Sequence, residues 1–252
     1  MNKAILLDIY TIAWKEWKEI FSQENNLKTG FLYLLLCVCI LAIFMPLPPK
    51  NAEELASSPV DLIYFWSGIP YSLIVLYRQF GIFEERQRKT LSTLIATKIP
   101  DCAIVFGKIG ATVILCWIST VLAGMLSIIK ANVVNQENIL FFYTGKSLLF
   151  GVCVSLLFTI LTASSGMFIS FSTKTATQFQ WLYLIVSSFF LLFLCYFINS
   201  IIYKIVSIQQ SIGLETASLE LSFLIYLISF TIIDILVLVF TFKRFKRDDL
   251  IS

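Results

Sequence analysis

The stretch EERQRKTLSTLIATKIPDCAIVFGK, residues 84–108, places a dense group of charges between two long apolar runs. Each of those runs approaches the roughly 20 apolar residues that a helix needs to cross a bilayer. A membrane protein with so much charge in one short loop offers that loop to water. We therefore expect two membrane spans joined by a loop that meets a partner in the cytosol.

The composition of the whole chain supports a membrane class. The 252 residues are 58% hydrophobic and only 14% charged, whereas soluble domains are about 45–50% apolar and about 25% charged. In lipid, each segment must satisfy its own backbone hydrogen bonds, and the apolar runs are continuous rather than short and alternating as in barrel strands. The sequence therefore predicts an all-α integral membrane protein.

Hydropathy divides the chain into six predicted transmembrane helices. Their expected bounds are Phe31–Leu47, Asp61–Phe83, Ile109–Ile129, Ser147–Phe171, Phe179–Ile202 and Leu221–Phe242. The chain is expected to form one transmembrane domain, 1–252. It comprises a cytosolic and interfacial segment 1–28, a six-helix bundle 29–242 and a basic tail 243–252.

The basic residues predict the orientation. If both termini are cytosolic, all but four of the 19 Lys and Arg fall on the cytosolic side. The four that remain outside are Lys50, Lys130, Lys146 and Lys204. Cytosolic loops of membrane proteins carry such an excess of Lys and Arg, so we expect a multi-pass protein with both termini in the cytosol.

The N-terminal segment has the pattern of an amphipathic helix. Its apolar residues recur at three- and four-residue spacing: Leu6, Ile9, Ala13, Trp17 and Ile20. Its charged residues fall mostly on the other side: Lys15, Glu16, Lys18 and Glu19. Such a helix lies in the membrane interface, with Trp14 and Trp17 at headgroup depth. It serves either as a surface anchor or also as a contact for a cytosolic partner.

Several classes of site are excluded or unsupported. The chain has no His, which removes most intramembrane metal enzymes and the usual general base. The triplet Gly145-Lys146-Ser147 resembles the end of a phosphate-binding loop, but Leu140 stands where the first glycine belongs. None of the six Cys has a partner in an exterior loop, so no disulfide framework is expected.

Asp234 is the clearest charge inside a predicted span. A carboxylate near the bilayer centre costs about 2.5–3.5 kcal/mol on insertion scales. We therefore expect it to face other helices or a wet cavity, near Asn199 or the hydroxyls of Ser164 and Ser165. An interhelical hydrogen bond, a role in substrate passage and proton coupling remain as alternatives.

Residues 84–100 read as a short cytosolic helix along the membrane. Leu91, Leu94 and Ile95 follow helical spacing and form an apolar underside. Pro100 is expected to end this helix, because the residue before a proline is pushed out of the helical region. An ordinary solvated loop is the alternative.

This arrangement resembles the permease subunits of type-2 ABC transporters. Their loop after span two reads Glu-x-Glu-x-Gly-Thr-Leu, then Leu-Leu-x-x-Pro, and closes on Gly-Lys at span three. The matching positions here are Glu85, Thr90, Leu91, Leu94, Pro100, Gly107 and Lys108. The chain departs from the pattern at Gln87, in place of the second acidic residue, and at Lys89, in place of the glycine.

The resemblance implies a function and a set of partners. The loop would be a coupling helix that contacts a separate cytosolic ATP-binding subunit. The residues implied in that interface are Glu84, Glu85, Arg86, Gln87, Arg88, Lys89, Thr90, Leu91 and Leu94. The interfacial helix, residues 9–21, would be a second contact zone.

The chain itself would not be an enzyme and would hold no cofactor, because ATP and Mg²⁺ would be bound by two copies of the partner. Two permease copies, either identical or one paired with a relative, would form an export pathway. The pathway would lie in the plasma membrane, which is the inner membrane of a bacterium. No role for nucleic acid is expected. The resemblance does not indicate the cargo, and it includes the permeases of haem-maturation exporters. A carrier or channel that depends on Asp234, and a membrane scaffold, remain as other classes.

Overall fold

The described part of the protein is entirely helical. The computed structural model describes residues 3–22, 35, 38, 39, 99–134, 145–173, 175, 177–179, 181–183, 185, 186, 189, 200 and 218–244. Its elements are α1 (Lys3–Ser22), α7 (Asp101–Val134), α8 (Gly145–Ser172) and α10 (Ser218–Arg244). No strand occurs among these residues, so the predicted all-α class is confirmed for them.

Three of the described helices are long and apolar enough to cross a membrane. The segments that meet this condition are Asp101–Lys130, Leu148–Phe171 and Leu224–Arg244. Helices α8 and α10 lie within three residues of the predicted fourth and sixth spans at both ends. The chain therefore has the character of a membrane protein.

The predicted start of the third span at Ile109 is wrong. Helix α7 begins eight residues earlier, at Asp101. The Pro100 carbonyl accepts the first backbone hydrogen bonds, from the amides of Ala103 (2.9 Å) and Ile104 (3.3 Å). The Asp101 carboxylate lies in the first turn, where the helix dipole favours negative charge. Gly107 and Lys108 therefore lie inside α7 and do not open it.

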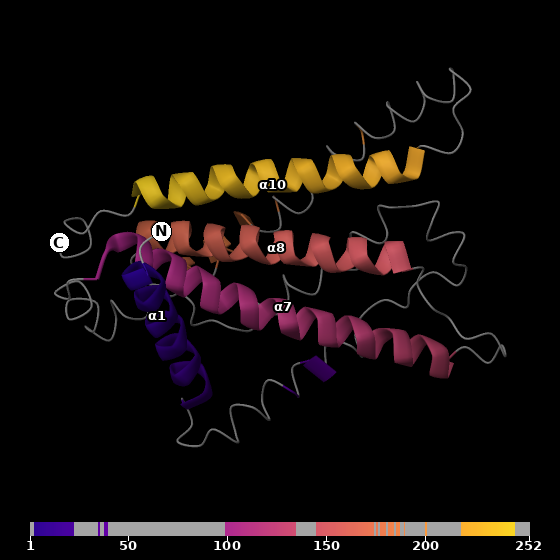
Figure 1. The fold of residues 1–252 in the computed structure, drawn as a ribbon, viewed down its shortest axis with the longest axis horizontal. Helices are drawn as coiled ribbons and strands as arrows, with labels where there is room; N and C mark the ends of the chain where they lie inside the picture. The colour runs from indigo at the N-terminus through magenta and orange to yellow at the C-terminus, as the bar shows by residue number, and fades with distance from the viewer. Residues whose placement is uncertain are drawn as a thin grey trace.

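The three long helices run side by side, with α8 between α7 and α10 (Figure 1). Helix α7 begins at the end of the bundle where α8 and α10 finish, so α8 and α10 are parallel and α7 is antiparallel to both. Side-chain contacts agree with this. Trp117 Nε1 donates to the Val152 carbonyl (3.3 Å) near the middle of the α7–α8 pair, and the Phe158 and Phe230 rings meet between α8 and α10.

Helix α1 crosses the first turns of α7 at a steep inclination (Figure 1). It lies at the end of the bundle where α7 begins and where α10 ends in Lys243 and Arg244. The distribution of Lys and Arg predicts that α1 and the last turn of α10 share one side of a membrane.

A short helical stretch after α8 packs back onto it. Thr175 caps this stretch, because its Oγ1 accepts from the Gln178 amide (3.3 Å) and its carbonyl accepts from the Phe179 amide (3.0 Å). Tyr183 then lies against Gly166 of α8, and its hydroxyl donates to the Thr162 carbonyl (3.4 Å). The described residues from 177 to 189 are helical, which agrees with the start of the predicted fifth span.

Other predictions fall outside the described residues. These are the coupling helix in 84–98, the second span 61–83, most of the first span 31–47, the remainder of the fifth span with Asn199, and the tail from residue 245.

Candidate functional site: the α1–α7 seam and Asp234

An ion pair joins α1 to α7. Lys108 Nζ donates to Glu16 Oε1 at 2.5 Å, and both side chains are almost fully shielded from solvent. Lys108 lies two turns beyond the start of α7. The expectation that Glu16 lies with the charged residues on the outer side of the N-terminal helix is wrong. Its carboxylate is buried because it meets the ammonium of Lys108.

Gly107 lets the two helices approach closely beside this pair. A Cβ atom at Gly107 would lie 2.8 Å from the Cβ of Ile12 and 3.1 Å from the Ile9 carbonyl oxygen. Real Cβ atoms do not come so near to other heavy atoms, so any larger residue at 107 would push α1 away. The glycine is needed here for space.

Trp17 adds a polar contact one turn further along α7. Its indole Nε1 donates to the Ala111 carbonyl oxygen at 2.9 Å. This carbonyl lies in mid-helix, so the bond attaches α1 to the backbone of α7. We refer to Ile12, Glu16 and Trp17 of α1, with Gly107, Lys108 and Ala111 of α7, as the α1–α7 seam.

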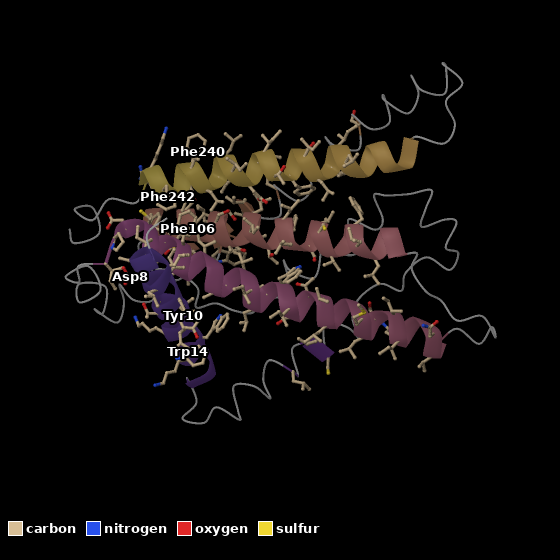
Figure 2. All side chains as sticks on the ribbon, viewed as in Figure 1. Asp8, Tyr10, Trp14, Phe106, Phe240 and Phe242 are labelled. Carbon is tan, nitrogen blue, oxygen red and sulfur yellow. The ribbon has the colours of Figure 1, made fainter. Side chains whose placement is uncertain are left out.

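The rest of α1 carries a second apolar surface. The side chains of Leu6, Leu7, Tyr10 and Trp14 are 49–63% exposed. Tyr10 and Trp14 stack on each other and lie on α1 away from α8 and α10 (Figure 2). A helix with one face on protein and a neighbouring aromatic face open is suited to the membrane interface, where Trp and Tyr are enriched.

The α1–α7 seam belongs to a core that reaches all four described helices. Ile12 is buried in one cluster with residues of α7 and α8, and Leu238 and Phe242 of α10 pack against it. The Phe106 and Phe242 rings lie 4.8 Å apart between α7 and α10. In Figure 2, Phe240 instead points away from α8. This end of the bundle is one packed unit.

The α8–α10 seam is built differently. We define it by Phe158 and Ser164 of α8 with Phe230, Asp234 and Thr241 of α10. Its hydroxyls donate mostly to their own helix: Ser164 Oγ to the Ile160 carbonyl (2.7 Å) and Thr241 Oγ1 to the Val237 carbonyl (2.8 Å). Thr241 Oγ1 also reaches the Ser164 carbonyl of α8 (3.3 Å). Small hydroxyl residues allow close helix packing in membranes.

Asp234 lies on the buried stripe of α10. The stripe repeats at helical spacing, with Phe230 one turn before Asp234 and Thr241 two turns after it, and each is at most 4% exposed. The burial of Asp234 is as predicted. Among the described residues, neither carboxylate oxygen has a hydrogen-bond partner.

The expected bonds from Ser164 and Ser165 are not formed. Both serine hydroxyls donate to carbonyls within α8, at 2.7–3.0 Å. The second expected neighbour, Asn199, lies outside the described residues.

The predicted coupling residues of the loop, 84–94, also lie outside the described part, whereas Pro100, Gly107 and Lys108 from the same motif are placed.

Sequence reasoning missed the pairing of Glu16 with Lys108. Two signals for it were present. Ile5, Ile9, Ile12 and Glu16 follow one 4–3–4 spacing, and Lys108 interrupts a long apolar run. A charged residue at an apolar position of an amphipathic helix, and an opposite charge inside an apolar run, are candidates to form an ion pair.

Comparison with known protein families, with curated proteins and with solved structures gave no match for this chain.

Proposed function

We propose that the chain is the transmembrane permease subunit of an ATP-driven exporter of the type-2 ABC class. It forms the substrate pathway with a second permease copy. Two cytosolic ATP-binding subunits drive it through the coupling helix in 84–100. Hydrolysis in the partner displaces this loop, and the bundle shifts between two states of access.

The observation that carries the proposal is the position of the α1–α7 seam. The loop that resembles a coupling helix ends at Pro100, and α7 begins at the next residue. Two turns later, α7 is joined to the amphipathic helix α1 by the Glu16–Lys108 pair. A displacement of the loop would therefore move the start of α7 together with α1, the second element at the membrane interface. The Gly-Lys of the family pattern, Gly107-Lys108, supplies both the space and the charge for this junction.

The arrangement of the long helices also supports the proposal. Helix α8 ends and α10 begins at opposite ends of the bundle, as a fifth span between them requires. The basic end of α10 lies at the same end as α1. These positions support the proposed six-span topology in the plasma membrane, in which both termini are cytosolic as the positive-inside rule predicts.

The proposal is tested by uncoupling the loop from the ATPase. Glu85→Lys reverses a charge in the interface, and Thr90→Pro breaks the short helix. Both variants are expected to insert into the membrane normally but to lose transport driven by ATP hydrolysis. Glu54→Lys is the matched control, because it lies between the predicted first and second spans, on the outer side if both termini are cytosolic, and it should keep coupled transport. Undiminished transport in both loop variants contradicts the proposal.

A secondary carrier is a second candidate, and Asp234 is the observation in its favour. A buried carboxylate without a hydrogen-bond partner in the described part is a common feature of ion and substrate pathways in membranes. A carrier would transport without any ATPase and would depend on Asp234. Transport that continues without ATP, and stops in Asp234→Asn, would select this candidate.

A further inference from the structure

We propose that the Glu16–Lys108 ion pair sets the register of α1 on α7, so that α1 and the start of α7 move as one body. Glu16 and Lys108 are positioning residues, and they contact no substrate. The consequence for transport depends on the proposed function, whereas the register itself does not.

The apolar contacts of the α1–α7 seam favour one register, but only modestly. Helix α7 presents three small buried residues one turn apart, Ala103, Gly107 and Ala111. Ile12 lies on the middle one. Hydrophobic contact is non-directional, and alanine differs from glycine by one methyl group. A slip of one turn would place Ile12 over the methyl group of Ala103 or Ala111, so α1 would have to move outward slightly, at the modest cost of overpacking.

The same slip would separate the two charges. One helical turn is about 5.4 Å of rise, so Glu16 and Lys108 would no longer be within hydrogen-bond distance. Each would then be buried without its charge partner, which is strongly unfavourable. The ion pair is therefore the larger of two barriers to a slip, and the overpacking of Ile12 on Ala103 or Ala111 is the smaller.

The burial of the pair argues against a role in stability alone. Two charges lose their hydration when they are buried, and a well-packed apolar pair of similar size is often equally or more stabilising. Buried polar groups are best documented as devices that fix register. An apolar pair at 16 and 108 therefore separates the two roles, because it keeps stability and removes the larger part of the preference for one register.

The register matters because of what lies next to it. Lys108 is about 10 Å along α7 from the first residue of the helix, Asp101, since each residue adds about 1.5 Å. The core around Ile12 also includes α8 and receives Leu238 and Phe242 of α10. A fixed α1 thus transmits a displacement at the start of α7 to the whole end of the bundle, whereas a sliding α1 absorbs it.

Disulfide crosslinking measures the register directly. In a background without the six native cysteines, Ile12→Cys is combined in turn with Ala103→Cys, Gly107→Cys and Ala111→Cys. With the ion pair intact, oxidation is expected to join 12 to 107 and to fail at 103 and 111, because a disulfide cannot bridge Cα atoms more than about 7 Å apart. In the Glu16→Leu/Lys108→Met variant, crosslinks are expected at 103 or 111 as well. Crosslinking confined to 107 in that variant overturns the proposal, as does equal crosslinking at all three positions with the pair intact.

The functional consequence is measured with the native cysteines present. Glu16→Leu/Lys108→Met is expected to melt at the same temperature as the unmodified chain or higher, to retain the ATP-binding subunit, and to transport about tenfold less cargo per ATP. Lys243→Met removes an exposed lysine at the end of α10 and serves as the control with unchanged coupling. Coupling at the level of the unmodified chain in the apolar variant contradicts the proposal.

The two proposals fail in different ways. If no ATP-binding subunit associates with the unmodified chain, the proposed function is wrong, and the crosslinking pattern still decides the register. If the subunit associates but the apolar variant stays in register and coupled, only the role of the ion pair is wrong.

Discussion

The α1–α7 seam and the α8–α10 seam join helices of the same protein by opposite means. At the α1–α7 seam, buried polar groups are paired across the helices, Glu16 with Lys108 and Trp17 with the Ala111 carbonyl. At the α8–α10 seam, the hydroxyls of Ser164 and Thr241 are satisfied mostly by their own helix. The first seam specifies one register by charge, and the second depends on shape.

The same contrast separates the two buried carboxylates. Glu16 has a cationic partner at 2.5 Å, whereas Asp234 has no hydrogen-bond partner in the described part of the chain. A paired carboxylate fixes the position of its helix. An unpartnered one contributes nothing evident to packing, so it is the better candidate for an interaction that occurs during transport.

The largest expected effect on stability comes from removing one charge of the Glu16–Lys108 pair while the other stays buried. Lys108→Met should destabilise the protein by about 3–5 kcal/mol, because the Glu16 carboxylate stays buried without its counter-charge. Thermal unfolding followed by tryptophan fluorescence measures the effect. Lys18→Met is the control and should change the free energy of unfolding by less than about 0.5 kcal/mol.

The second substitution, Glu16→Leu, sharpens this result. Adding Glu16→Leu to Lys108→Met should recover the whole loss, because neither charge of the pair is then left buried, and a double-mutant cycle detects the non-additivity. Equal destabilisation by Lys108→Met and Lys18→Met would show that charge pairing does not distinguish the α1–α7 seam.

Asp234→Leu should have the opposite sign. Leu keeps the branched outline of Asp, and the cost of about 2.5–3.5 kcal/mol for a carboxylate in mid-membrane is removed, so the variant should melt at a higher temperature. A transport assay on the same protein then assigns the role. Loss of transport in both Asp234→Leu and Asp234→Asn at normal expression supports a role in the pathway, and unchanged transport supports packing.

Substitution of three glycines by alanine tests how closely neighbouring atoms approach each glycine. Gly107→Ala should cost about 1–3 kcal/mol, the usual range for overpacking, because the new methyl would lie 2.8 Å from Ile12 Cβ. Gly166→Ala should cost less, since the Tyr183 ring at 3.2 Å can move slightly. Gly110→Ala meets nothing within 4 Å and should stabilise α7 by up to about 1 kcal/mol through helix propensity.

Thermal unfolding of the three variants under one condition checks the order. If Gly107→Ala is as well tolerated as Gly110→Ala, then α1 does not pack on α7 as described.

The sequence was sufficient for the parts of the fold that depend on composition. The predicted fourth and sixth spans agree with α8 and α10 within three residues at each end, because long apolar runs end there in polar flanks. The burial of Asp234 was also foreseeable, because an isolated carboxylate in an apolar helix has to avoid lipid.

The sequence was insufficient where a charge is stabilised by a distant residue. Lys108 was assigned to a solvated flank, which placed the start of the third span at Ile109 instead of Asp101. Glu16 was assigned to an exposed face for the same reason. Each assignment follows the usual behaviour of a charged residue, and each fails because its partner lies 92 residues away in the chain.

The central claim is that the chain couples to an ATP-binding subunit through the loop before α7. The most direct test is purification of the tagged chain from its native membrane in mild detergent, with identification of the proteins that accompany it. The expected result is a stoichiometric soluble protein with a phosphate-binding loop, which is lost from the Glu85→Lys variant. A chain that purifies alone, and that stimulates no ATPase when added back, contradicts the account.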